Sequence, residues 1–370
     1  MSRPTVLVAG MGDVGVLTAM HLARHVDVVG VATTPGLVSG QELGLRLSDP
    51  GRWARDYWVD YRRYRRLDEV EIVRGRVTGI DGDTRTATIT TDDSGDTTRS
   101  WDALVIATGV TNGFWRSPDV VDAAAVADGL RTQHDALRSA GRVAVIGGGA
   151  AAVAAAAGIA ARLPDARVDL YFPGERPLRD HHPRTQATVQ RRLGRLGVAL
   201  HAGHRARVPA GAERADVGPG VVEWTTGQHG VSADAIVWAI GRATPHTDWL
   251  PARVLDEHGF VRVDENLRVS GLPRTFAVGD VAATDPLRGS ARNRADRLVA
   301  HNVGAELSRR RLRRYRPRAT RWGSVLGPQA TGLEVFTPTG IGVRIPRPVV
   351  DRVLRPWIVD RGIYGGVRPR

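Results

Sequence analysis

The amino-terminal segment combines an apolar run with glycines whose spacing suits the binding of a diphosphate. These glycines are Gly10, Gly12 and Gly15, a complete G-x-G-x-x-G pattern. In such a loop the first glycine permits a tight turn, the second lets backbone amides reach a pyrophosphate, and the third allows a helix close to the strand. The helix then begins near Asp13 and Val14 with its positive end toward the anion. The alternative is a purely structural glycine turn.

The pattern returns further along the chain, again between an apolar run and a helical stretch. It reads Gly147-x-Gly149-x-x-Ala152, and the backbone of Ala150 and Ala151 opens the helix. Alanine at the third position slightly widens the spacing between helix and strand, a change often associated with NADP. Two copies of one nucleotide-binding unit are the main organisational prediction.

Neither unit ends its second strand in the acid that usually holds ribose hydroxyls. In the first unit Thr33 follows the strand, and its hydroxyl is a weaker substitute for a carboxylate. In the second unit Tyr171 and Phe172 stand at this position, with Arg176 just beyond. An Arg without an opposing acid suits a 2′-phosphate, so the sequence favours NADPH over NADH. The alternative is a solvated Arg176.

The hydrophobic pattern predicts an α/β fold with two Rossmann-like dinucleotide-binding domains. Strands are expected at 5–9, 26–32, 143–146, 167–172, 221–224, 231–238 and 340–345, helices after each glycine loop, at 53–66 and at 294–307, and an antiparallel meander at 70–91.

Three further segments make the pattern specific. Two apolar strands end in Thr108-Gly109 and in Gly241, and residues 275–280 read Thr-Phe-Ala-Val-Gly-Asp. With the two glycine loops, in this order over 5–305, they resemble the pyridine nucleotide-dependent flavin oxidoreductases. The resemblance implies FAD contacts from Gly10, Gly12, Asp13, Val14, Gly15, Thr33, Thr108, Gly109, Gly279 and Asp280, and NAD(P)H contacts from Gly147, Gly149, Ala150, Ala151, Arg176 and Gly241.

Within this family, residues 107–114 and the short tail resemble the type II NADH dehydrogenases and the ferroptosis-suppressor (apoptosis-inducing-factor-like) quinone reductases. The likeness implies hydride transfer from nicotinamide to flavin, and then electron transfer to a quinone or another small-molecule acceptor; the flavin carries the chemistry. It also implies a split FAD domain with an insertion. The expected boundaries are 1–112 and 245–312 for FAD, 113–244 for NAD(P)H, and 313–370 for a basic linker with a C-terminal strand and amphipathic helix.

Two alternatives to this function stay open, and one departure from the family pattern bears on the second of them. Related proteins carry a helix Glu near the nicotinamide, where this chain has Ala154. The first alternative is a reductase for an acidic electron carrier of the ferredoxin type, which the Arg-rich surface would steer. The second is a flavin- or nucleotide-binding sensor without turnover.

Composition narrows the chemistry. The chain has no cysteine, which excludes disulfides, thiolate metal sites and a redox-active Cys pair. Its formal charge is +13, all basic residues are Arg, and eight Arg fall within 309–321. For this Arg-rich segment we favour a solvated basic linker, then an anionic lipid or acidic partner, with nucleic acid last.

There is no signal-peptide layout and no apolar run of roughly 18–20 residues, so we expect a cytoplasmic protein.

Three side-chain groups allow a structural as well as a functional interpretation. The C-terminal stripe Val349, Val350, Val353, Leu354, Trp357 and Ile358 has helical spacing. We favour its docking on the same domain or at a homodimer interface, and the alternative is a peripheral membrane surface. Trp53, Tyr57, Tyr61 and Tyr64 can share one helical face, as packing or beside a quinone. His181, His182, His201 and His204 are interpreted as surface or capping residues, with no metal.

Overall fold

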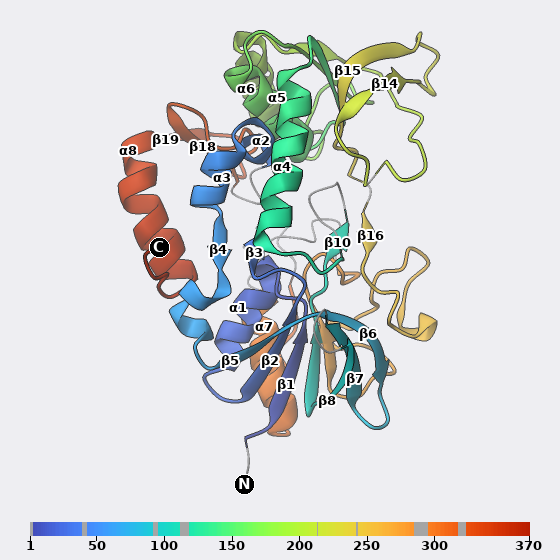
Figure 1. Cartoon of the computed structure of the whole chain (residues 1–370), viewed down its shortest axis with the longest axis vertical. Coiled ribbons are helices and arrows are strands. Elements are labelled where there is room, and N and C mark those ends of the chain that lie inside the picture. The colour runs from blue at the N-terminus through green and yellow to red at the C-terminus, as the bar shows by residue number, and fades with distance from the viewer. Residues whose placement is uncertain are drawn as a thin grey trace.

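The computed structural model describes residues 3–38, 43–91, 95–111, 118–212, 214–241, 243–284, 295–316 and 323–370. In this part of the chain two five-stranded sheets lie at opposite ends of the molecule, with the short strands β10 and β16 between them (Figure 1).

The first sheet is entirely parallel, in the order β17-β9-β1-β2-β5. Its strands are β1 (Thr5–Ala9), β2 (Asp27–Ala32), β5 (Val70–Arg74), β9 (Ala103–Ile106) and β17 (Thr275–Ala277). Successive side chains of a strand point to opposite faces. Val6 and Val8 accordingly pack with α1 (Asp13–Leu22) and α7 (Ala295–Leu307). Leu7 and Ala9 pack on the other face, against the antiparallel sheet of β6 (Arg76–Asp81), β7 (Thr86–Thr91) and β8 (Gly95–Ser100).

The second sheet repeats this plan with one antiparallel edge strand, in the order β13-β12-β11-β15-β14. Its strands are β11 (Arg142–Ile146), β12 (Arg167–Tyr171), β13 (Ala199–His201), β14 (Gly218–Val222) and β15 (Val231–Trp238). Val143 and Val145 pack with α5 (Ala150–Arg162) and α6 (Pro183–Arg195) in one core. The predicted α/β class with two Rossmann-like units is confirmed.

The remaining elements connect or cover these sheets. They are β3 (Gly36–Val38), α2 (Leu43–Ser48), α3 (Pro50–Asp56), β4 (Trp58–Asp60), η1 (Tyr61–Arg63), η2 (Arg65–Leu67), β10 (Val110–Thr111), α4 (Ala123–Arg138), β16 (Thr244–Pro245), η3 (Ala252–Val254), β18 (Gly332–Phe336), β19 (Gly342–Pro346), α8 (Arg347–Val349) and the π-helix η5 (Val350–Ile363).

The prediction of one helix over 53–66 is wrong. Helix α3 ends at Asp56 because the next residues pair with β3 as strand β4, after which Asp60 caps the short helix η1 by accepting from the amide of Arg62 at 2.9 Å. The four aromatic residues therefore do not share a helical face, although Trp53, Tyr61 and Tyr64 are buried. Packing, the interpretation we favoured, is confirmed for these three.

Two other predictions need adjustment. Strand β5, expected in a meander, joins the first parallel sheet by pairing with β2, so the meander consists of β6 to β8 only. The predicted helix at 294–307 is α7, with Arg294 outside the described residues. Also outside them are residues 112–114 of the closer family likeness and 317–321 of the Arg-rich stretch.

The C-terminal segment folds along the first domain, beside α3 and β4 (Figure 1). Arg355 pairs with Asp56 at 2.6 Å, Arg368 pairs with Asp68 at 2.6 Å, and the ring centroids of Tyr64 and Tyr364 lie 5.0 Å apart. Docking on the same domain is thus confirmed for this side of the helix. No helix in the described ranges has both the length and the apolar character needed to cross a bilayer.

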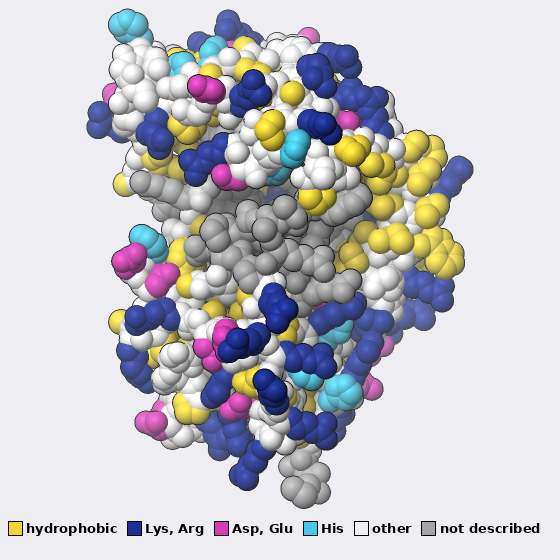
Figure 2. All heavy atoms as spheres, turned by 180° about the vertical axis from the view of Figure 1, so that it is seen from behind, with side chains coloured by type: hydrophobic (Ala, Val, Ile, Leu, Met, Phe, Trp, Pro, Cys, Tyr) yellow, Lys and Arg dark blue, Asp and Glu magenta, His cyan; other side chains and the backbone are white. Residues whose placement is uncertain are grey.

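The predicted apolar stripe, however, is not what docks. Val349, Val353, Trp357 and Ile358 are 43–58% exposed, and they form a hydrophobic patch together with Ile341 and Val343 of the β18–β19 hairpin. The patch lies at the right edge of Figure 2. Pro356 lies inside this helix and has no amide hydrogen to donate. At these four residues the stripe does not pack on the same domain, and the expected homodimer interface or membrane surface stays a prediction for it.

Candidate nucleotide-binding site

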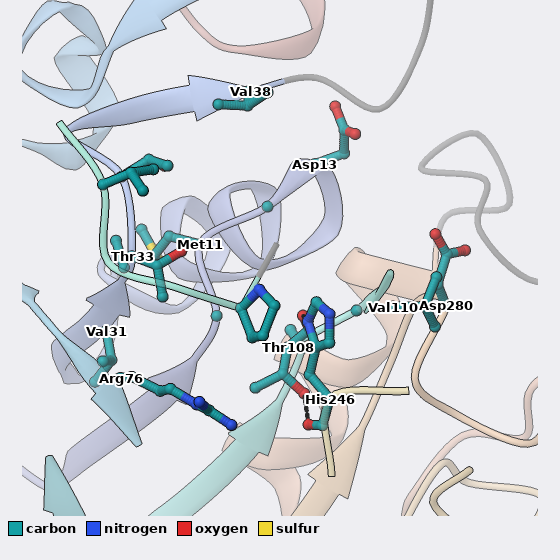
Figure 3. A pocket seen from close by; sticks show the side chains of 18 of the residues that line it. Met11, Asp13, Val31, Thr33, Val38, Arg76, Thr108, Val110, His246 and Asp280 are labelled. Atoms are coloured by element: carbon teal, nitrogen blue, oxygen red, sulfur yellow. Dashed lines mark hydrogen bonds between the residues drawn. The ribbon is translucent and has the colours of Figure 1, made fainter. Parts of the chain in front are cut away.

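A cavity of about 340 Å³ lies at the carboxyl ends of the strands of the first sheet (Figure 3). Residues that follow four strands line it: Gly10 after β1, Thr33 after β2, Thr108 after β9 and Asp280 after β17. In open α/β sheets this end of the strands is where ligands bind. The sequence therefore predicted a set of residues that the fold brings together around one cavity.

Two of the three glycines of the first loop occupy positions that a side chain would disrupt, and the third borders open space. Gly10 has φ +99°, and a Cβ atom on it would lie 2.5 Å from the carbonyl oxygen of Ala107. A Cβ on Gly15 would lie 1.9 Å from the carbonyl oxygen of Gly10. Gly12 has no atom within 4 Å of such a Cβ, so its surface faces open space. Packing therefore restricts the loop at Gly10 and Gly15 and leaves it accessible at Gly12.

The open side of this loop leads to the start of a helix. Helix α1 begins at Asp13, its N-cap is Gly12, and no side chain caps its first amides. A helix start without a side-chain cap and the helix dipole together favour an anion at this position. Asp13 and Asp280 project from different elements near one side of the view, and Thr33 lies on the other (Figure 3).

The residues present fit FAD. The uncapped helix start and the open side of Gly12 suit its diphosphate. Gly279 has φ +85° and adjoins Val14, which leaves Asp280 at the cavity wall with a half-buried side chain. An elongated dinucleotide can therefore run from the end of β2 past the loop to Asp280.

His246 is a cavity residue that sequence reasoning missed. Its Nδ1 lies 3.0 Å from the carbonyl oxygen of Thr108, and its Nε2 lies 2.7 Å from Oγ1 of Thr111. A carbonyl can only accept, so Nδ1 carries the hydrogen. Thr108 Oγ1 also donates to the backbone oxygen of His246 at 2.8 Å. These bonds fasten the antiparallel pair β10–β16, which joins the two sheets.

Arg46 and Tyr61 were also missed as cavity residues. Arg46 lies on α2, is 1% exposed and stacks over Trp53 with its guanidinium carbon 4.7 Å from the ring centroid. Tyr61 donates to the carbonyl oxygen of Met11 at 2.7 Å, and burial raises the pKa of its hydroxyl. Tyr61 belongs to the aromatic set that the sequence analysis interpreted as packing or as lying beside a quinone, whereas Arg46 belongs to no motif. Separate elements bring both residues to the cavity only in the folded chain.

The second glycine loop has the same construction as the first. Gly147 has φ +143°, and a Cβ on it would lie 2.1 Å from the carbonyl oxygen of Ala239. Gly149 has open space around it and is the N-cap of α5, again without a side-chain cap. Ala150 and Ala151 are exposed. In both copies the first glycine packs on the alanine two residues before the closing glycine, here Gly241.

The residues expected to select the nucleotide point in different directions. Phe172 is buried in the core of the second sheet, and Tyr171 is buried in an aromatic cluster on the opposite face. Arg176 is exposed on the loop after β12. Of these three side chains, that of Arg176 alone is exposed.

Helix α2 crosses α5 closely beside Ala154. A Cβ on Gly44 of α2 would lie 2.0 Å from the carbonyl oxygen of Ala154, and one on Gly158 would lie 2.5 Å from that of Gly44. The backbones of α2 and α5 therefore touch, as only glycine at the crossing allows. Ala154 is 8% exposed at this crossing.

Two of the histidines that we interpreted as surface or capping residues, and not as metal ligands, have side-chain contacts within the protein. The ring of His182 caps α6 by accepting from the amide of Arg184 at 3.2 Å, as predicted. His201 lies 2.9 Å from the carboxylate of Asp169, a residue with no exposed surface that Arg142 also contacts at 2.8 Å. Burial alone would raise the pKa of Asp169, but these hydrogen bonds and the nearby guanidinium groups lower it.

Comparisons with known proteins agree with this construction. The family model described as pyridine nucleotide-disulphide oxidoreductase matches residues 4–304. The chain is similar to an NADH dehydrogenase-like protein of Mycobacterium tuberculosis, with 29% identity over 311 residues covering 75% of this chain and 72% of that protein.

Two solved structures share the fold. The sulfide:quinone oxidoreductase of Aquifex aeolicus has a TM-score of 0.73 and 15% identity, covering 99% of this chain and 93% of that one. A ferredoxin reductase of Rhodopseudomonas palustris has a TM-score of 0.66 and 21% identity, covering 90% of this chain and 82% of that one.

Proposed function

Because the chain belongs to the pyridine nucleotide-disulphide oxidoreductase family, we propose that it passes reducing equivalents from NAD(P)H through FAD to a quinone. Membership makes it an oxidoreductase with FAD and NAD(P)H as cofactors. The observation that carries the proposal is the pair of glycine loops, each opening onto an uncapped helix start.

We assign the contacts with FAD and with the nicotinamide nucleotide to different sets of residues. Gly10, Gly12 and Gly15, with the amides that follow at Asp13 and Val14, hold the FAD diphosphate. Thr33 and Thr108-Gly109 line its path, and Gly279-Asp280 bind the ribityl chain. Gly147, Gly149, Ala150, Ala151, Arg176 and Gly241 hold the nicotinamide nucleotide. FAD held by these residues would supply hydride acceptance and electron transfer, and the protein would orient the nicotinamide nucleotide and the acceptor against it.

The domain boundaries that we propose are those of a split FAD domain, 1–112 and 245–312, around a NAD(P)H domain, 113–244, with 313–370 as a tail. Strand β17 completes the first sheet after the whole second sheet has intervened, which supports this division.

The acceptor must meet the flavin directly, because the chain has no cysteine to relay electrons. A quinone is supported by the likeness to a sulfide:quinone oxidoreductase over nearly the whole chain. The hydrophobic patch of β19 and the C-terminal helix supports contact with a membrane surface, where quinones dissolve. A homodimer interface is the alternative for this patch, and the cytoplasmic location stays a prediction.

Anaerobic titration tests the proposal. The purified protein should be yellow, and NADPH or NADH should bleach the flavin absorbance, which a soluble quinone such as menadione should restore. A protein that carries flavin but does not bleach with either nucleotide would instead be the sensor. Turnover with a ferredoxin that falls steeply with salt, when quinone turnover does not, would identify the carrier reductase.

Nucleotide choice has its own test. Arg176 is the exposed cation beyond β12, and Arg179 is exposed three residues later. Arg176→Ala should lower kcat/KM for NADPH by at least about tenfold and leave that for NADH almost unchanged, since a charged hydrogen bond contributes about 1.5–3 kcal/mol. Arg179→Ala is the matched control. Equal loss for both nucleotides in Arg176→Ala would contradict a 2′-phosphate contact.

A further inference from the structure

A large hollow lies at the opposite end of α1 from the cofactor cavity. It has a volume of about 1550 Å³ and is lined by the carboxyl end of α1, by η2, by α7, by residues 310–316 and by Gly362. We call it the basic hollow. Figure 2 shows Arg and His side chains gathered over the lower half of this face.

Its composition differs from that of the chain. Eight of the nineteen lining residues are Arg and three are His. Arg accounts for 52 of 370 residues overall, so the high Arg content of the chain does not by itself explain the lining. Six of the eight Arg lie within 297–316, and the fold brings Arg24 from the end of α1 and Arg66 from η2 beside them.

Within the lining there is a single carboxylate. It belongs to Glu265, which already pairs with Arg314 at 2.7 Å. With His neutral, eight Arg and one Glu give the lining a formal charge of 8 − 1 = +7. His21, another lining residue, contacts the buried Asp296 at 3.1 Å.

Three guanidinium groups are held close together without a compensating acid. Arg24, Arg66 and Arg297 come from the end of α1, from η2 and from α7, and none has an ion pair or side-chain hydrogen bond within the described part of the chain. Burial, together with the charges of Arg24 and Arg297, lowers the pKa of Arg66. Like charges placed together oppose folding unless an anion joins them.

We propose that the basic hollow binds a phosphate-bearing anion. Guanidinium groups match the oxygens of a phosphate as a planar fork, and three of them from three directions can surround one group. Free polyphosphates and phospholipid headgroups share this chemistry. None of the glycines of either nucleotide loop lines the hollow, so this site is separate from the proposed cofactor sites.

Two probes and two double variants test the site. Arg24 and Arg297 are exposed, so Arg24→Gln with Arg297→Gln should fold normally. The control, Arg195→Gln with Arg205→Gln, removes the same charge from exposed positions on the second domain. FAD-loaded protein is titrated with inorganic tripolyphosphate by calorimetry. It is also sedimented with vesicles of phosphatidylcholine, with and without phosphatidylglycerol, at physiological ionic strength.

The expected result is binding that weakens at least about tenfold in the hollow variant and stays within twofold in the control, since each charged hydrogen bond contributes about 1.5–3 kcal/mol. If tripolyphosphate behaves in this way, the ligand is a free polyphosphate; if only phosphatidylglycerol vesicles do, it is a lipid headgroup. Equal weakening in both variants, or no binding of either probe, would overturn the proposal. So would a short DNA duplex that binds more tightly than both probes.

Discussion

Replacing Gly12 by Ala should separate cofactor binding from folding. No atom lies within 4 Å of a Cβ at this position, so the added methyl group meets no protein atom. The backbone, with φ −74° and ψ −168°, is extended and acceptable to alanine. Losing glycine at an N-cap costs about 0.5–1 kcal/mol, and the lower entropy of the unfolded chain offsets about 0.4–1 kcal/mol. The unfolding free energy of the apoprotein should therefore hardly change.

In the proposed FAD site, the same methyl group would occupy the space through which a diphosphate reaches the amides of α1. Two charged hydrogen bonds contribute about 3–6 kcal/mol together, and losing even the lower amount raises the Kd for FAD by about two orders of magnitude. Fluorescence titration of the apoprotein with FAD measures this change, and urea denaturation of the apoprotein measures stability.

Gly149→Ala is the matched control, because Gly149 is also an N-cap in open space. It should leave the Kd for FAD unchanged and weaken NAD(P)H binding. If Gly12→Ala bound FAD within about twofold of the wild type while Gly149→Ala lost it, the assignment of the two loops would be reversed. If both variants bound FAD normally, the diphosphate would not lie on either loop.

Three further substitutions test the packing that holds the site. Gly10→Ala should destabilise the protein by at least about 3 kcal/mol in urea denaturation, through positive φ and overlap with a carbonyl oxygen; a loss below 1 kcal/mol would contradict this. Gly44→Ala should lower stability by about 1–3 kcal/mol, whereas Gly51→Ala, in open space on α3, should not. Asp169→Asn should remove about 3 kcal/mol at pH 7. Because the pKa of this carboxyl is lowered on folding, the wild type should lose this contribution only below about pH 4, and the variant should lack that acid transition.

Local patterns predicted the residues whose role is set by the backbone. The first glycine of each loop packs on the carbonyl of an alanine that follows a strand of the same sheet. Both the glycine loop and the segment that ends this strand therefore show a recognisable pattern in the sequence. The strands before the loops are apolar because parallel sheets are covered on both faces. These features depend on a few neighbouring residues, and they could be inferred from order and spacing.

Residues that reach the cavity from separate elements could not be inferred in this way. The burial of Arg46 depends on where helix α2 packs. Helix α2 packs on α5 through Gly44, and no periodicity in the sequence indicates this contact. The strand pairing that ends α3 is likewise a tertiary contact, and it changed the expected helix into four short elements. The C-terminal stripe had the right spacing, but the sequence does not reveal which side of the helix the arginines hold against the domain.

The strand order of the first sheet constrains how the chain can be synthesised and assembled. Strand β17 lies at the edge beside β9, so four strands are available early and their last neighbour emerges from the ribosome only after the whole second sheet. Until then one side of β9 presents unpaired amides and carbonyls, an arrangement that invites pairing with other chains. We expect nascent chains halted between the two halves to depend on chaperones more than chains released complete.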